Sequence, residues 1–522
     1  MVERTQREVE DTVVFGIRWD GGRRPRNGRK WLAAAVAVLV AALAPAAAQA
    51  MPLRAPAPAL QTAVVVPAAG HDAGARALVA RLGGRAGRRL PLIGGFAARV
   101  PAGALARLSA SPLVRTASPN VGLSVRDDGS SDAATSMAIV RGASGAQAIQ
   151  DAGGDGSGVG IAVVDSGVMR VQGLDSGQVV RGPDFSDEAY SADLRGLDTF
   201  GHGTHLAGVI AGRDGDVTGV APGATVVSVK VADSDGQTSL LRVLVGLDWV
   251  RRHADDPGLN IRIVNLSLGV DASSAGYVRD PLAYAAEALW RSGLVVVAAA
   301  GNKGADATSL DVPAADPYVI AVGALDTNGT LDPSDDGVAS FSSRGSSIRQ
   351  PDFVAPGTGI VSFRVPGSSL DMQFPGARVG DRYFRGSGTS QATAVASGLA
   401  ALVLQQRPRL SPDQVKVILD ASAADLGAPA AAEGNGRVDL SRLAGLITPS
   451  ADSAKQSFRN AIFDLAQSNN ADDSGRNSAG NSRWNGRTWS GRTWSGRTWS
   501  GRTWSGRTWS GGEWDDGSAP GS

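Results

Sequence analysis

The sequence predicts an α/β fold in which helices cover both faces of a mostly parallel, doubly wound sheet. Between about positions 158 and 421, short apolar runs rich in valine and isoleucine alternate with segments of helical spacing. This alternation is typical of parallel sheets, because each crossover between parallel strands carries a helix. Some of the apolar runs end in an acid or a glycine-rich turn, and open α/β sheets place their sites at such strand ends.

The individual elements follow from local patterns. Strands are predicted where β-branched and apolar residues follow one another without a polar break, at 158–165, 225–231, 261–266, 294–300 and 318–322. Helices are predicted at 239–253, 282–292, 391–404 and 412–421. The first of these helices is amphipathic, the third has no polar face and suits a fully buried helix, and the last begins with Pro412 after Ser411.

Residues 1–50 are predicted to be a targeting segment rather than part of the fold. Basic residues between positions 23 and 30 precede an apolar run from Trp31 to Leu43, and Ala48-Gln49-Ala50 has the form of a cleavage site. A run this short suits a signal peptide, because a membrane-spanning helix needs about 20 residues. We therefore expect a secreted protein, and a retained membrane anchor is the alternative.

Residues 51–126 are predicted to form a small α+β unit. The expected strands are 61–66, 91–100 and 112–117, and the expected helices are 73–82 and 102–108. A polar, glycine-rich linker begins near Arg126 and is a candidate processing zone.

Composition excludes several classes of function. The chain of 522 residues has a formal net charge of only +1, which gives no electrostatic reason to expect nucleic acid or an anionic membrane as partner. It has no cysteine, so disulfides, thiol catalysis and thiolate metal sites are excluded.

Three polar residues with glycines around them suggest nucleophilic catalysis. Asp165 ends a predicted strand, His202 lies in Gly-His-Gly-Thr-His, and Ser390 follows Gly-Ser-Gly-Thr where the long apolar helix begins. A serine there lies beside free backbone N–H groups, which favour a developing negative charge. Each residue alone suits an ordinary structural role, such as an N-cap serine. Their occurrence together, in this order, favours catalysis.

These motifs resemble those of the subtilisin-like serine proteases, the subtilase family (peptidase family S8). The resemblance covers roughly residues 165–440 and is carried by VVDSG, GHGTHLAG, NLSLG, VVVAAAGN and GTSQATAVASG. It implies a three-layer subtilisin-like fold with Ser390 as nucleophile, His202 as general base and then general acid, and Asp165 as the orienting carboxylate. It also implies an endopeptidase that acts through an acyl-enzyme without a cofactor.

The resemblance further implies a side-chain oxyanion donor and a substrate-binding set. The oxyanion donor is Asn302, after a buried strand. The substrate-binding residues form two facing walls and the floor of a pocket: Ser267, Leu268, Gly269, Ala300, Gly301 and Asp311. The first wall binds substrate backbone by strand addition.

Asp311 has two interpretations. At the floor of the primary pocket its carboxylate favours Lys or Arg on the N-terminal side of the cleaved bond, because an unpaired charge in a partly dry pocket is costly. Alternatively it caps a turn and faces solvent. Cleavage after Arg126 would agree with the first interpretation.

The sequence departs from the family pattern near the nucleophile and in one loop. Gln391, Ala394 and Val395 replace the usual methionine, proline and histidine, and none of them is a catalytic group, so we expect activity. The loop 212–219 is shorter than the family's calcium loop. Its two acids, at 214 and 216, could still bind a cation, but a solvated polar turn is favoured, so no tight calcium site of the usual kind is predicted.

The predicted parts are a signal peptide or membrane anchor at 1–50, an I9-like inhibitory pro-segment at 51–126, a catalytic domain at 127–447 and a tail at 448–522. By position the second part resembles the segment that precedes subtilase domains, assists their folding and acts as an intramolecular inhibitor.

The tail repeats Gly-Arg-Thr-Trp-Ser, with seven tryptophans five residues apart from Trp484 to Trp514. A five-residue step keeps one face of neither a strand nor a helix. Two interpretations stand: an unstructured spacer, or attachment to a polysaccharide or cell-wall polymer through exposed Trp and Arg. The rival function is therefore a cell-surface binding protein with an ancillary protease domain. The expected partners are protein or peptide substrates, the chain's own pro-segment and, in the attachment interpretation, such a polymer.

Overall fold

The computed structural model describes residues 59–125, 134–270, 277–346 and 349–441. The predicted leader, most of the linker and the predicted tail lie outside these residues. Among the residues that are described, no helix is both long enough and apolar enough to cross a membrane.

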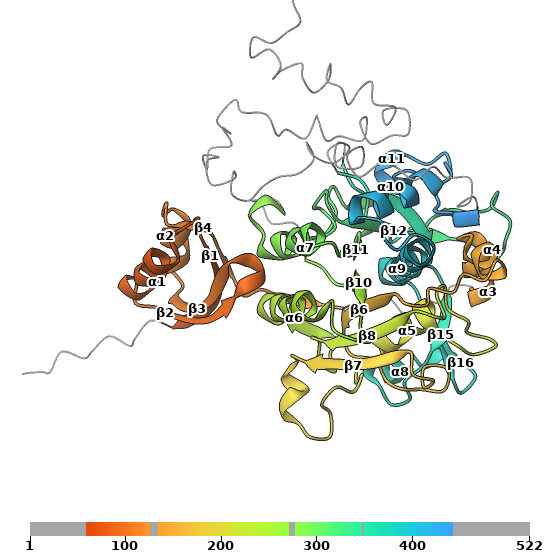
Figure 1. The fold of residues 1–522 in the computed structure, drawn as a ribbon, viewed down its shortest axis with the longest axis horizontal. Coiled ribbons are helices and arrows are strands. Elements are labelled where there is room, and N and C mark those ends of the chain that lie inside the picture. The colour runs from red at the N-terminus through yellow and green to blue at the C-terminus, as the bar shows by residue number, and fades with distance from the viewer. Residues whose placement is uncertain (1–58, 126–133, 271–276, 347–348, 442–522) are drawn as a thin grey trace, which may run out of the picture. The chain divides into compact units, whose positions relative to one another are not determined.

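Residues 60–119 form an antiparallel sheet with two helices packed on it (Figure 1). The strands are β1 (Leu60–Pro67), β2 (Arg85–Leu90), β3 (Gly95–Pro101) and β4 (Val114–Pro119), in the order β2-β3-β1-β4, and the helices are α1 (Asp72–Arg81) and α2 (Ala104–Ser109). Their shared core contains Val65, Val79, Phe96 and Leu108. Most of the expected elements are present, but the strand expected from Pro91 begins only at Gly95, after a 3₁₀ turn, η1 (Pro91–Ile93).

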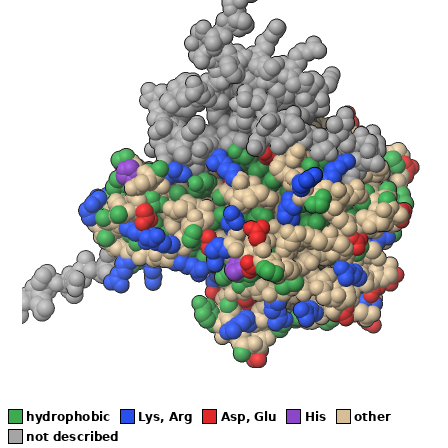
Figure 2. Space-filling model, viewed as in Figure 1, with side chains coloured by type: hydrophobic (Ala, Val, Ile, Leu, Met, Phe, Trp, Pro, Cys, Tyr) green, Lys and Arg blue, Asp and Glu red, His purple; other side chains and the backbone are tan. Residues whose placement is uncertain are grey.

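Strand β2 was not predicted, because its residues are mostly polar and exposed. It carries Arg85, Arg88 and Arg89, and only Leu90 is buried. Figure 2 shows Lys and Arg side chains gathered along this edge of the sheet. Exposed arginines protect an edge strand from pairing with another chain.

The larger sheet is almost entirely parallel. Its strands are β6 (Gly160–Asp165), β7 (Val179–Asp184), β8 (Thr225–Lys230), β10 (Ile261–Leu266), β11 (Val295–Ala299), β12 (Ile320–Asp326), β13 (Gly337–Val338) and β14 (Phe353–Pro356). They run in the order β7-β8-β6-β10-β11-β12-β13, with β14 also pairing β12 and only β13 antiparallel. The middle strands are buried on both faces, as their unbroken apolar runs indicate.

Helices cover both faces of this sheet (Figure 1). Helices α5 (His202–Ala211) and α9 (Thr389–Gln406) pack together on one face, and α6 (Leu240–His253) and α7 (Pro281–Arg291) pack together on the other. Helix α9 is buried from Thr389 to Leu404, as predicted from its lack of a polar face. The doubly wound, three-layer α/β fold is confirmed.

The remaining elements are short, apart from α10. They are β5 (Gly122–Ser124), α3 (Met137–Ala143), α4 (Ala146–Asp151), η2 (Asp187–Tyr190), β9 (Gln237–Ser239), η3 (Tyr277–Arg279), η4 (Gly304–Asp306), β15 (Ile360–Phe363), α8 (Ser369–Gln373), η5 (Pro375–Ala377), β16 (Arg378–Val379), β17 (Tyr383–Gly386), α10 (Pro412–Ser422) and α11 (Ala430–Glu433). The predicted start of α10 is confirmed, because Ser411 and Gln414 cap each other's backbone N–H groups.

Two buried cations hold the loop that precedes β12. The Arg349 guanidinium donates to the carbonyls of Ala314 and Val319, each at 3.1 Å, and forms an ion pair with Asp352. Lys416 Nζ donates to the Val319 carbonyl at 2.8 Å and contacts Asp352 at 3.0 Å. Because these charges are buried and paired, they fix the loop that begins just after Asp311.

Candidate active site

Asp165 and His202 form a fully buried pair at the carboxyl end of β6. His202 Nδ1 lies 2.8 Å from Asp165 Oδ1, which also accepts the Ser166 backbone N–H at 2.7 Å. Because a carboxylate can only accept, His202 carries its proton on Nδ1, which leaves Nε2 as the basic nitrogen. His202 is the first residue of α5 and follows Gly201, whose φ of 105° favours glycine.

Ser390 lies in the first turn of α9, next to the end of β10. Its Oγ is 3.4 Å from the Ser267 carbonyl oxygen, and Ser267 Oγ donates to the Ser390 carbonyl at 3.1 Å. Gly388, just before the helix, allows a close approach: a Cβ there would lie 2.9 Å from Gln391 Oε1. A side chain at position 388 would therefore displace the Gln391 side chain beside Ser390.

The parallel sheet brings the two parts of the site together. Strands β6 and β10 are neighbours, with Val163 opposite Asn265. Asp165 and Ser267 each come two residues after this pair, toward the carboxyl end of the sheet. His202 is bonded to the first of these positions and Ser390 to the second, so all three predicted catalytic residues lie at one edge of the sheet.

Asn302, just after β11, is held in one orientation by Thr389. Its Oδ1 accepts the Thr389 backbone N–H at 2.9 Å and the Thr389 hydroxyl at 2.8 Å. The amide nitrogen therefore points the other way, and it lies 3.2 Å from where a Cβ on Gly388 would be. A preoriented N–H donor beside the start of α9 is suited to an oxyanion. Sequence reasoning did not single out Thr389.

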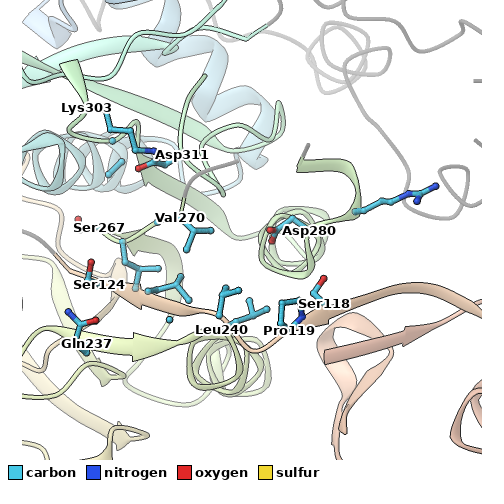
Figure 3. Close-up of a pocket in the computed structure, with 18 of the residues that line it drawn as sticks. Ser118, Pro119, Ser124, Gln237, Leu240, Ser267, Val270, Asp280, Lys303 and Asp311 are labelled. Atoms are coloured by element: carbon cyan, nitrogen blue, oxygen red, sulfur yellow. Dashed lines mark hydrogen bonds and ion pairs between the residues drawn. The ribbon is translucent and has the colours of Figure 1, made fainter. Parts of the chain in front are cut away.

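A cavity of about 740 Å³ opens beside Ser390. Most of the predicted substrate-binding residues line it, namely Ser267, Leu268, Gly269, Gly301 and Asp311, together with Asn302. Ala300 does not: it is fully buried, Ala299 lines the cavity in its place, and the Ala300 carbonyl accepts the Asp311 N–H at 3.0 Å. Asp311 lines the cavity rather than facing open solvent, and its carboxylate forms an ion pair with Lys303 (Figure 3).

A strand from the N-terminal part of the chain lies along this cavity. β5 pairs antiparallel with β9, Ser124 pairs with Gly269 on its other side, and the Val125 N–H donates to the Gly236 carbonyl at 2.9 Å. Figure 3 shows Ser124 between Ser267 and Gln237. This is the geometry of a peptide bound by strand addition.

Comparison with known families shows which protein family this chain matches. Residues 156–438, more than half of the chain, match the model of the subtilase family, peptidase family S8.

The chain belongs to the subtilase family. The resemblance inferred from its motifs is thus confirmed. The serine protease AprX of Bacillus subtilis (strain 168) is 41% identical over 273 residues, which cover 51% of this chain and 61% of that relative. Subtilisin DY of Bacillus licheniformis is 33% identical over 287 residues, covering 54% of this chain and 89% of that relative.

A solved structure agrees with the fold. The crystal structure of fervidolysin from Fervidobacterium pennivorans, a keratinolytic enzyme related to subtilisin, superposes with a TM-score of 0.59 at 25% identity. The match covers 76% of this chain and 63% of fervidolysin. This subtilase therefore spans less than two thirds of the length of fervidolysin and of AprX.

The short loop predicted to be a solvated turn is instead paired within this subtilase. Asp214 forms an ion pair with Arg382 and accepts the Tyr383 hydroxyl at 3.0 Å, and the same hydroxyl lies 3.3 Å from Asp216. The guanidinium thus supplies the positive charge for Asp214. Among the described residues, no group of three or more His, Asp or Glu side chains is arranged to hold a metal.

Asp198 is a functional candidate that sequence reasoning missed. It is fully buried; its Oδ1 accepts the Ser166 hydroxyl at 2.8 Å and the Gly201 N–H at 2.7 Å, and its Oδ2 accepts the Thr204 N–H at 2.8 Å. It therefore caps the helix that begins with His202 and joins that helix to Ser166, the neighbour of Asp165. Its only sequence signal is an acid four residues before the histidine.

Asp198→Asn is expected to destabilise the fold by about 2–4 kcal/mol, because an amide NH₂ would face backbone N–H donors in a buried site. It is also expected to lower kcat, since the start of α5 loses its anchor. Urea unfolding and peptide hydrolysis measure the two effects. The exposed Asp193→Asn is the matched control, and equal stability of the two variants would contradict the role.

His205, also in α5, makes stability depend on pH. Its Nε2–H donates to the carbonyls of Ile360 and Phe384, each at 3.2 Å. Burial, followed by the nearby His202, lowers the pKa of His205 from 6.5 to about 4. Between these pH values the imidazole is protonated in the unfolded chain but neutral in the native chain. The free energy of unfolding therefore decreases as the pH is lowered from about 6.5 to about 4, by on the order of 3 kcal/mol in total.

The test compares urea unfolding at pH 7 and pH 4.5 with His205→Gln, which keeps an N–H donor. Both chains carry Ser390→Ala to prevent proteolysis. The variant is expected to lose less stability on acidification. Asp316, whose pKa burial raises to about 7, acts in the opposite sense but equally in both chains. Identical pH dependence of the two chains would refute this role of His205.

Proposed function

We propose that this subtilase is a secreted serine endopeptidase that is made as an inactive precursor and cleaves off its own N-terminal unit. The observation that carries the proposal is the buried Asp165–His202 pair at the same edge of the sheet as Ser390, with β5 lying along the cavity next to Ser390 as a bound peptide would. Membership of the subtilase family and the predicted signal peptide support it.

The proposed chemistry assigns one step to each group. Ser390 Oγ attacks the peptide carbonyl while His202 Nε2 accepts its proton, and Asp165 stabilises the imidazolium. The Asn302 amide stabilises the oxyanion. His202 then protonates the leaving amine, and a water molecule hydrolyses the acyl-enzyme by the same steps.

Inhibition by the N-terminal unit has two sources in this proposal. First, β5 fills the strand position that a substrate would take. Second, the unit is docked on the catalytic domain by hydrogen bonds from Leu92 N–H to Asp248 at 3.1 Å, from Thr116 to the Arg279 carbonyl at 2.9 Å, and from Leu241 N–H to Asn120 at 2.8 Å. As long as the N-terminal unit stays docked, β5 therefore occupies the cavity and a substrate cannot bind there.

The test is expression of the parent chain beside Ser390→Ala, with sequencing of the N-terminus and labelling by a fluorophosphonate. The parent is expected to lose its N-terminal unit and to be labelled, whereas the variant stays whole and unlabelled. A parent that is processed and labelled no more than the variant would sink the proposal.

A further inference from the structure

We infer that the bond cleaved in maturation is Arg126–Asp127 and that this subtilase prefers peptides with arginine on the N-terminal side of the cleaved bond. The inference rests on the proposed function and adds its substrate class. It is carried by the register of β5 in the cavity and by the charges of the pocket beside it.

The register fixes which residue faces the nucleophile. Ser124 is antiparallel to Gly269, so two residues later in the peptide corresponds to two residues earlier in the wall, at Ser267. The Ser267 carbonyl is 3.4 Å from Ser390 Oγ. The described strand ends at Val125, and the next residue in the sequence is Arg126. For a peptide bound in this register, we infer from the sequence that the bond after Arg126 is the one that is cut.

The pocket beside Ser390 carries a carboxylate. Asp311 lies between the two walls: a Cβ on Gly269 would be 3.1 Å from Asp311 Cβ, and a Cβ on Gly301 would be 2.6 Å from Asp311 Oδ2. The absence of a side chain at Gly301 thus leaves Oδ2 accessible from the cavity. The Asp311 side chain is only 15% exposed, so its charge is weakly screened.

Lys303 moderates this charge. Its ammonium pairs with Asp311 Oδ1 at the edge of the pocket and is 42% exposed (Figure 3). A lysine on a flexible stem can move to solvent when a substrate enters, whereas a bound guanidinium can form two parallel hydrogen bonds to the carboxylate. Arginine is therefore accepted, and Lys303 reduces its advantage over uncharged side chains.

The experiment measures kcat/KM of the matured full-length parent, Asp311→Asn and Lys303→Ala on two peptides that differ only in Arg or Phe at the cleaved position. Active sites are counted with a fluorophosphonate. For Asp311→Asn we expect the ratio of kcat/KM on the Arg peptide to kcat/KM on the Phe peptide to fall by about 10- to 100-fold. For Lys303→Ala we expect about a 3- to 10-fold gain on the Arg peptide. The mature parent is expected to begin at Asp127.

The outcomes separate this inference from the proposed function. A parent that prefers the Phe peptide, or whose ratio of Arg to Phe activity is unchanged by Asp311→Asn, overturns the arginine preference while leaving the protease function intact. A first cut elsewhere, with Arg126→Phe maturing as fast as the parent, overturns the register. If the parent is neither labelled by the fluorophosphonate nor active on either peptide, the proposed function fails and the inference with it.

Discussion

Ser390→Ala, His202→Ala and the double variant are expected to lower kcat by the same factor, on the order of a millionfold. The losses do not add, because the hydroxyl without its base and the base without its hydroxyl are equally unable to form the acyl-enzyme. This magnitude is the one known for subtilisin, a member of the same family, and is carried over from it. Residual activity is expected from the oxyanion site and substrate binding alone.

The measurement needs chains freed of the N-terminal unit, which inactive variants do not remove themselves. A recognition sequence for a cysteine protease inserted among residues 127–133 solves this. The added protease is then stopped with an alkylating agent, which has no cysteine target in this chain. His253→Ala, on α6, is the matched control and should keep its kcat. A double variant much slower than either single variant would contradict the shared role.

Asn302→Ala is expected to lower kcat by about 100- to 1,000-fold with little change in KM, because the amide donor acts on the charge that develops in the transition state. This range also comes from subtilisin. Thr389→Val should cause a smaller loss, since it removes one of the two hydrogen bonds that orient the amide and keeps the backbone one. Steady-state kinetics on one peptide compare both variants with the parent. An unchanged kcat in Asn302→Ala would remove this residue from the mechanism.

Much of the fold was predictable because strands buried on both faces leave unbroken apolar runs. Strand β7 escaped prediction since Gly182 and Pro183 interrupt it, and β14 because it is only four residues long. Strand β2 escaped because its exposed arginines have no apolar pattern. Local sequence patterns thus predict strands that are buried in the core. They miss strands whose position is determined mainly by hydrogen bonding to a neighbouring strand.

The site divides in the same way. Asp165, His202, Ser390 and Asn302 stand in recognisable motifs at strand ends and helix starts. Asp198 does not, because its role comes from contacts with residues up to 32 positions away. Likewise, the ion pair of Asp311 with Lys303 and the exclusion of Ala300 from the cavity depend on where loops meet in three dimensions, which no sequence spacing records.

The docking of the N-terminal unit has a consequence for how activity would develop in time. Its contacts with α6 and η3 do not involve the bond that we infer to be cut, so cleavage there would leave them in place. What changes is the effective concentration of the inhibitor, from that of a tethered segment to that of a free molecule. A concentrated preparation would then stay latent after every chain has been cut. The same preparation, diluted as it spreads from its source, would become active.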